Sequence, residues 1–136
     1  MIHILISAEQ RIFRQGLHHL LDEYADLCVV AQTSGYAETL SAVRASEPDL
    51  AILELSMPGQ YGIEIVGEIK AIRPNLKTLI LSPRSVPSVA VRALHAGLDG
   101  IIAKESGIEE LVAAVRHLAN GGPQVCPDFQ ECVAHG

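Results

Sequence analysis

Four polar side chains, each at the end of a short apolar run, are the residues of this chain best suited to chemistry. They are Glu9, Glu54, Ser82 and Lys104. Two carboxylates beside an ammonium and a hydroxyl could together hold a divalent cation and a phosphoryl-like group. Charged residues at strand ends are also commonly just solvated, so the functional interpretation requires that the fold bring these four together.

The apolar runs that precede these residues have the composition of buried parallel strands. Most are continuously apolar rather than alternating, as expected of strands covered on both faces. We predict strands over Ile2–Ile6, Leu27–Ala31, Leu50–Leu53, Thr78–Leu81 and Gly100–Ala103.

Stretches with helical periodicity separate the predicted strands. They are Arg11–Tyr24, Tyr36–Ala45, Ile63–Ile72, Ser88–Ala96 and Ile108–Ala119. In the first of them we assign the apolar face to Ile12, Leu17, Leu20 and Leu21. Strict alternation of strand and helix predicts an α/β fold, a doubly wound five-stranded parallel sheet flanked by five helices. Sites in such sheets lie at the carboxyl ends of the strands, where all four polar residues are expected.

Composition narrows the class of protein further. The 136 residues are 49% hydrophobic and 19% charged, which suits one globular domain. With a net charge of −6 and no basic run, we expect no direct binding of nucleic acid and no membrane association. No run is long enough to cross a bilayer and no signal peptide is evident, so we expect a cytoplasmic location.

One stretch of the chain resembles a known family. Pro48–Gly59, continued by Gly62, is similar to the core motif of response-regulator receiver domains, and Lys104 stands where that family has a lysine. Further similarities, to the NarL/FixJ (LuxR-type) subfamily, lie in Ile2–Ile6, Arg14–Leu17 and Arg92–Gly97. The resemblance runs from about residue 2 to residue 122, and it implies the CheY-like form of the flavodoxin-like fold.

The metal site that the resemblance implies is incomplete in this sequence. Receivers carry an acidic pair after the first strand that binds Mg²⁺, and here the pair is Ala8-Glu9. We expect Glu9 and Glu54 to form an acidic pocket. With the carbonyl of Ser56, they would still leave the oxygen shell short of a ligand. We expect no required cofactor, and Mg²⁺ binding that is weak or absent.

The phosphorylation site that the resemblance implies is also altered. Glu54 stands in the place of the phosphoaccepting Asp, while Ser82 and Lys104 keep the family's hydroxyl and lysine. Pro83 replaces the small residue after the hydroxyl. Ser82 and Ile101 stand at the two switch positions that the resemblance implies, and Ile101 replaces the aromatic residue there. Because Glu54 is one methylene longer than Asp, we expect it to pair with Lys104 instead of accepting a phosphoryl group.

The expected function is therefore that of an atypical, non-enzymatic receiver module of a two-component-type system, independent of phosphorylation. It would regulate an output such as transcription through contacts with a protein partner, its own output domain or a second copy. One alternative is a conventional receiver that accepts phosphate on Glu54; another is a small ligand-binding flavodoxin-like domain. We assign residues 1–122 to the receiver and 123–136 to a tail or the start of a linker to an output domain.

Overall fold

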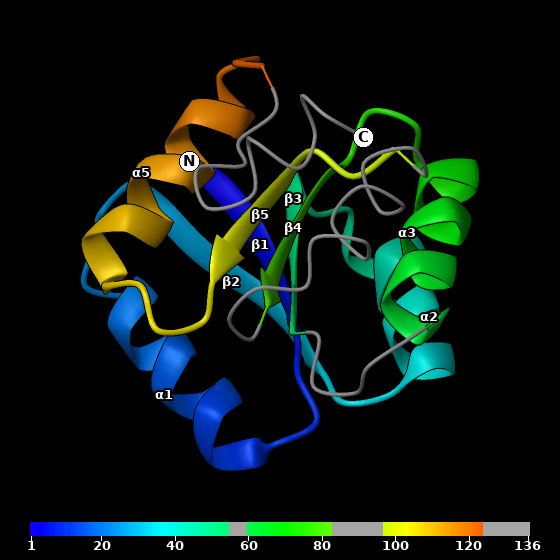
Figure 1. The fold of residues 1–136 in the computed structure, drawn as a ribbon, viewed down its shortest axis with the longest axis horizontal. Coiled ribbons are helices and arrows are strands. Elements are labelled where there is room, and N and C mark those ends of the chain that lie inside the picture. Colours follow the sequence, from blue (N-terminus) through cyan, green and yellow to red (C-terminus); the bar gives the residue numbers. More distant parts are fainter. Residues whose placement is uncertain (55–59, 83–96, 124–136) are drawn as a thin grey trace.

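The computed structural model describes residues 1–54, 60–82 and 97–123 (Figure 1). Its strands are β1 (Ile2–Ser7), β2 (Leu27–Thr33), β3 (Leu50–Glu54), β4 (Lys77–Ser82) and β5 (Gly100–Ala103). Its helices are α1 (Arg11–Leu21), α2 (Tyr36–Ser46), α3 (Gln60–Ile72) and α5 (Ile108–Ala119). The helix predicted over Ser88–Ala96 lies outside the described residues, as do Ser56 and Pro83. The segment predicted as tail or linker lies outside them from residue 124 onward.

All five strands form one parallel sheet in the order β2-β1-β3-β4-β5. The doubly wound α/β prediction is therefore confirmed for the sheet and for the four helices described. The strand order reverses between β1 and β3, so the crevice expected in such a sheet lies at the carboxyl ends of these two strands. No helix within the described ranges is long and apolar enough to span a membrane.

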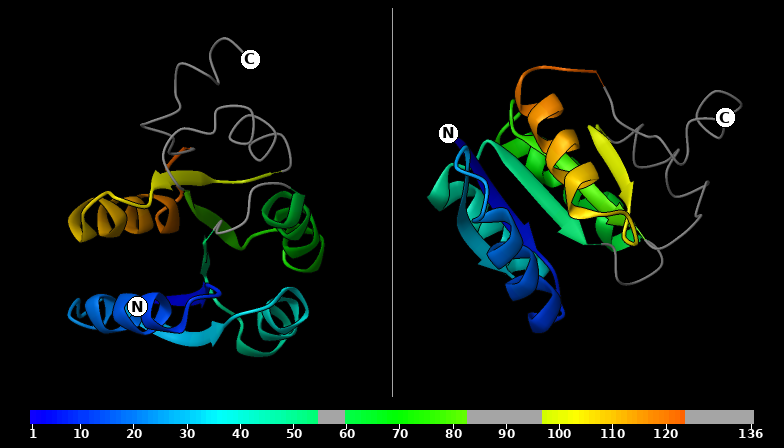
Figure 2. Two further views of the ribbon diagram at one scale, coloured as in Figure 1. Left: turned by 60° about the horizontal axis from the view of Figure 1, so that its bottom comes forward. Right: turned by 90° about the vertical axis from the view of Figure 1, so that its left-hand side faces the viewer.

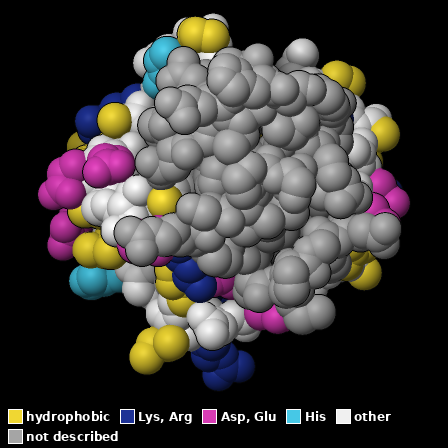
Figure 3. All heavy atoms as spheres, in the orientation of Figure 1, with side chains coloured by type: hydrophobic (Ala, Val, Ile, Leu, Met, Phe, Trp, Pro, Cys, Tyr) yellow, Lys and Arg dark blue, Asp and Glu magenta, His cyan; other side chains and the backbone are white. Residues whose placement is uncertain are grey.

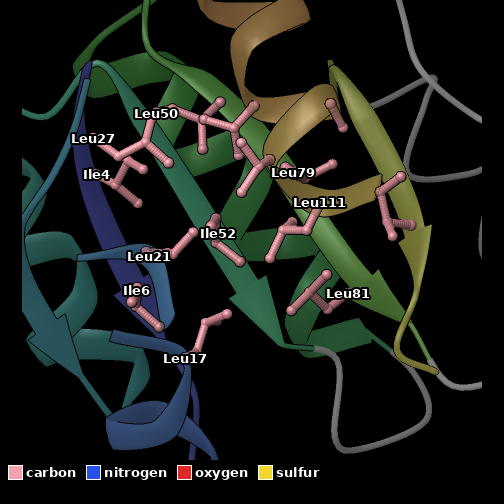
Figure 4. Packing of buried hydrophobic residues seen from close by; sticks show 14 of the residues in the cluster. Ile4, Ile6, Leu17, Leu21, Leu27, Leu50, Ile52, Leu79, Leu81 and Leu111 are labelled. Carbon is pink, nitrogen blue, oxygen red and sulfur yellow. The ribbon is translucent and has the colours of Figure 1, made fainter. Parts of the chain in front are cut away.

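Helices cover both faces of the sheet (Figure 2). Alternate residues of β1 show how the faces divide, since Leu5 packs in the cluster that includes α2 and α3 while Ile4 and Ile6 pack in the one that includes α1 and α5. Figure 4 shows the second of these clusters, with Leu17 and Leu21 of α1 packed among strand side chains. This two-sided burial explains the continuously apolar strands.

The predicted apolar face of α1 is partly wrong. Leu17 and Leu21 are buried, but Ile12 is 85% exposed and Leu20 is 42% exposed. Five positions separate Ile12 from Leu17, which places them about 140° apart around an α-helix. Phe13, one position further on, packs against the core in place of Ile12.

Four strands extend beyond the predicted ends. Ser7 pairs with Thr33, Glu54 pairs with Leu81, and Ser82 is in register with Ala103. The predictions stopped at the last apolar residue, but the backbone ladder continues through polar ones. The polar side chains at these positions consequently belong to the sheet itself, which places them more rigidly than a loop would.

The surface carries opposite charges on the first turns of two helices. Acidic side chains gather over the first half of α5 in Figure 3, and Glu109 and Glu110 lie in the first turn of that helix. By contrast, α1 begins with Arg11, has no acidic residue in its first turn, and has His18 and His19 in its last turn.

Candidate functional site

The carboxyl edge of the sheet brings three of the four predicted site residues together. Glu54 ends β3, Ser82 ends the neighbouring strand β4, and Lys104 directly follows β5. The backbone amide of Lys104 donates a hydrogen bond to the carbonyl of Ser82 at 2.7 Å, which fixes where the lysine side chain starts. The strand registers place Ser82 one residue and Lys104 two residues beyond the level of Glu54, so all three lie at the same edge of the sheet.

The ammonium of Lys104 forms an ion pair with Oε2 of Glu54. The Glu54 side chain is only 1% exposed, whereas that of Lys104 is 28% exposed. The carboxylate is thus buried, and the lysine reaches it from a partly exposed position. The ion pair expected from the lengthened side chain of Glu54 is present.

Burial makes this ion pair necessary for Glu54. Both carboxylate oxygens are buried, and neither accepts a hydrogen bond with regular geometry from the residues that the structure describes. A buried carboxylate without compensation is costly, because it loses its hydration and gains nothing in return. Within the described part of the chain, the positive charge of Lys104 supplies that compensation.

The aromatic ring of Phe13, on α1, is a second neighbour of Lys104. The lysine nitrogen lies 4.6 Å from the ring centroid, within the range of a cation–π contact. Sequence reasoning missed Phe13 as a site residue, because its contact with Lys104 joins segments that only the tertiary fold brings together. The sequence carried no local signal for it.

The side chain of Arg14 fixes the loop between β1 and α1. Nη1 of Arg14 donates a hydrogen bond of 2.6 Å to the carbonyl of Ala8. Ala8 is buried and Glu9 is exposed, so the acid that remains at this end of β1 lies on the surface. The structure thus places Glu9 at the predicted edge, but it does not bury it with Glu54.

These residues do not fit the magnesium site that the receiver resemblance implies. Ala8 has no side-chain oxygen, and Glu54 is already paired with Lys104. No group of three or more His, Cys, Asp or Glu side chains able to hold a metal occurs among the described residues. Ser56, the predicted carbonyl ligand, lies outside them.

Ser82 and Ile101, which stand at the predicted switch positions, are both buried close to the sheet core. Ser82 is 4% exposed, and Ile101 is 2% exposed within the cluster on the α2 and α3 face. Ile101 is in register with Ile80 of the neighbouring strand β4. Its branched aliphatic side chain is thus part of the packed core, and its correspondence to the switch position stays a prediction.

Three buried hydroxyl groups, one each at the ends of β1 and β2 and one on α2, form another feature that sequence reasoning missed. The Oγ1 atom of Thr39 lies 2.8 Å from Oγ of Ser7 and 2.7 Å from Oγ1 of Thr33. Thr39 also donates to the carbonyl of Gly35 at 2.6 Å. The hydroxyl groups satisfy one another, so they tie α2 to the two strands beside the pocket.

Comparison with known families and proteins agrees with this architecture. Residues 4–116 match the family described as the response regulator receiver domain. The transcriptional regulatory protein DesR of Bacillus subtilis is 32% identical over 131 residues, covering 96% of this chain and 65% of DesR. The transcriptional regulatory protein UhpA of Escherichia coli is 31% identical, covering 100% of this chain and 68% of UhpA. The chain thus spans about two thirds of the length of these relatives.

Solved structures agree with the same family. A two-component response regulator of the LuxR family from Aurantimonas sp. superposes with a TM-score of 0.89 at 27% identity, covering 99% of this chain and 96% of that one. The signal receiver domain of the putative NarL of Mycobacterium tuberculosis superposes with a TM-score of 0.81, also at 27% identity, covering 88% and 97% of the two chains. The family match covers residues 4–116, and both the sequence identity to DesR and the superposition on the LuxR-family regulator agree with it. This chain therefore belongs to the response regulator receiver domain family.

Proposed function

We propose that this receiver module works without phosphorylation of its own pocket. The ion pair between Glu54 and Lys104 is the observation that carries the proposal. In the family that the sequence resembles, the lysine is part of the pocket that receives the phosphoryl group. Here a carboxylate of the chain itself already pairs with that lysine.

The side chain of Glu54 disfavours phosphoryl transfer on geometric grounds as well. Its extra methylene moves the carboxylate forward by roughly 1 Å relative to an aspartate, and a misplacement of that size can cost about a hundredfold in rate. An incoming phosphoryl donor would also have to break the pair with Lys104. The displaced carboxylate and the competing ion pair both slow phosphorylation of Glu54.

The metal that would assist such a transfer is disfavoured too. The alanine at position 8 and the exposed position of Glu9 leave the carboxylate of Glu54 without a buried acidic neighbour from β1. Divalent cations of this kind need several oxygen ligands at once. The proposal therefore involves no metal-dependent step.

The output that we propose is control of transcription through protein contacts. DesR and UhpA are both named as transcriptional regulatory proteins, and this chain matches about two thirds of their length. Its net charge of −6 disfavours direct contact of this segment with nucleic acid. The module would then act by docking to an output domain, to another protein or to a second copy of itself.

Intact-mass measurement after incubation with acetyl phosphate and Mg²⁺ tests this proposal. The unmodified chain is expected to show no stable adduct. The variant carrying both Ala8→Asp and Glu54→Asp restores the two missing aspartates, and it is expected to recover some labelling. A gain of one phosphoryl group by the unmodified chain, mapped to Glu54, would favour the conventional receiver instead.

A further inference from the structure

Lys104 lies between two side chains that come from different parts of the fold. On one side its ammonium pairs with Glu54, at the end of β3. On the other, it lies over the ring of Phe13 on α1, with 4.6 Å between the nitrogen and the ring centroid. One lysine thus joins the buried carboxylate of Glu54 to a helix that covers the sheet.

The Phe13 end of this link borders a small apolar cavity. The cavity has a volume of about 180 Å³ and lies between α1 and the segment that leads from β5 into α5. Phe13, Leu17, Lys104, Ile108 and Leu111 are among the residues that line it. Lys104 therefore contributes to the wall of this cavity as well as to the ion pair with Glu54.

We infer that Phe13 is a positioning residue for Lys104, and that the series Glu54–Lys104–Phe13 couples the buried carboxylate of Glu54 to the cavity between α1 and α5. This inference deepens the proposed function, because it names a path by which a pocket held by its own ion pair affects the outer helices. It concerns the unphosphorylated chain and requires no phosphoryl group or metal.

The physical reason lies in the exposure and flexibility of Lys104. Its side chain is 28% exposed, and a lysine stem has four rotatable carbons, so the ammonium has many solvated positions available. The face of an aromatic ring attracts a cation through the ring quadrupole and restricts those positions. The ring of Phe13 thus favours the conformers in which the ammonium reaches Glu54.

Coupling of this kind is reciprocal. The charge of Glu54 affects the position of Lys104, and the position of Lys104 affects that of the Phe13 ring. The two ends then share one coupling free energy, so a substitution at either end affects the other end to the same extent. A loss of charge at Glu54 should therefore change the environment of the side chains that line the cavity. A leucine at position 13 would fill much of the same apolar space but would offer no ring.

Methyl-detected NMR of the full 136-residue chain tests this inference. The probes are the methyl groups of Leu17, Ile108 and Leu111, compared with and without Glu54→Gln. We expect Glu54→Gln to shift these resonances in the chain with Phe13, and also when Phe13→Tyr keeps the ring. In the Phe13→Leu background we expect the shift to fall to the error of the measurement.

A second readout reports directly on the lysine. Ring currents should displace the ε-methylene protons of Lys104 upfield, and Phe13→Leu should abolish that displacement while Phe13→Tyr retains it. The matched control is Tyr24→Leu. It removes the ring of the other cation–π contact between described residues, in which Cζ of Arg116 lies 5.4 Å from the centroid of the Tyr24 ring. That control should leave the response of the cavity methyl groups to Glu54→Gln unchanged.

The link can also be broken at its centre, which keeps the test decisive if Phe13→Leu does not fold. In a Lys104→Met background, Glu54→Gln should no longer shift the cavity methyl groups. If the shift persists undiminished in either background, the coupling is refuted. Because no phosphoryl donor is present, that result would leave the proposed independence from phosphorylation untouched.

Discussion

Glu54 and Lys104 form an ion pair between a buried and a partly exposed side chain, with the carboxylate 1% exposed and the lysine 28% exposed. If the pair is broken, water can solvate the ammonium of Lys104 but cannot reach the buried carboxylate of Glu54. The two residues therefore depend on the pair unequally, and Glu54 loses more when the pair is broken.

A double-mutant cycle on this pair should show strong coupling. Lys104→Met and Glu54→Gln should each destabilise the fold. Lys104→Met should cost more, about 3 kcal/mol or above, because it leaves the buried carboxylate of Glu54 uncompensated. Glu54→Gln should cost less, because the partly exposed ammonium of Lys104 can be solvated instead. The double variant should lose less than the sum of the two, as measured by urea unfolding.

The pair between Asp26 and Arg116 is the natural comparison, since its side chains are 46% and 45% exposed. Its own cycle should show much smaller coupling than the pocket pair. Additive behaviour in the Glu54–Lys104 cycle would contradict a compensating role for the lysine.

Magnesium should bind this chain weakly, with a dissociation constant in the millimolar range or higher, on the order expected from so few oxygen ligands. Calorimetric titration measures this constant. Ala8→Asp together with Glu54→Asp should tighten binding, because the variant adds a carboxylate directly after β1 and shortens the one on β3. A micromolar constant for the unmodified chain would be incompatible with this account of the site.

The sheet could be predicted from the sequence because its strands are buried on both faces. Continuous apolar runs such as Leu50–Leu53 identified the strands, and strict alternation with helices determined the parallel order. The strand ends could not be predicted from polarity. Ser7 and Ser82 continue the backbone ladder although their side chains are polar.

The site could be predicted only as far as it depends on strand ends. The positions of Glu54 and Lys104 follow from the general rule for parallel sheets, and their pairing followed from the length of the glutamate side chain. The part played by Phe13 depends on how α1 packs beside the β5–α5 segment, which no local pattern encodes. The exposure of Ile12 was not predicted, because Ile12 was assigned to the same helical face as Leu17 although a spacing of five residues separates the two around the helix.

The pH dependence of stability should show a contribution from Asp26 and Arg116. Hydrogen bonds from the Arg116 guanidinium, at 2.9 Å, hold the pKa of Asp26 below its ordinary value. Stability from a carboxyl whose pKa is lowered by folding is present above its unfolded pKa of about 4, and it is lost as the pH falls through the lower folded value.

Arg116→Gln should therefore be less stable than the unmodified chain at neutral pH, and the difference should shrink below about pH 4. Thermal unfolding at a series of pH values measures this difference. Arg11→Gln, at an exposed arginine of α1, serves as the control and should show no comparable dependence. A gap between Arg116→Gln and the unmodified chain that widens in acid would overturn the assignment.

Self-association should be detectable without phosphorylation, because a module of this kind needs a fixed contact surface. The receiver resemblance implies a face that includes α5, packed with either the preceding helix or α1. Sedimentation equilibrium should show a dimer at moderate protein concentration. Glu109→Lys with Glu110→Lys, which reverses the acidic first turn of α5, should weaken it. A chain that stays monomeric at high concentration would count against this prediction.

The central claim is that the chain's own ion pair keeps the pocket from taking a phosphoryl group. Beryllofluoride, which mimics an attached phosphoryl group, tests it most directly when added with Mg²⁺ and followed through the backbone amide resonances of Ser82 and Lys104. We predict no saturable shift in the unmodified chain, and a saturable one in the variant with Ala8→Asp and Glu54→Asp. Saturable shifts in the unmodified chain, at concentrations that also saturate the variant, would contradict the claim.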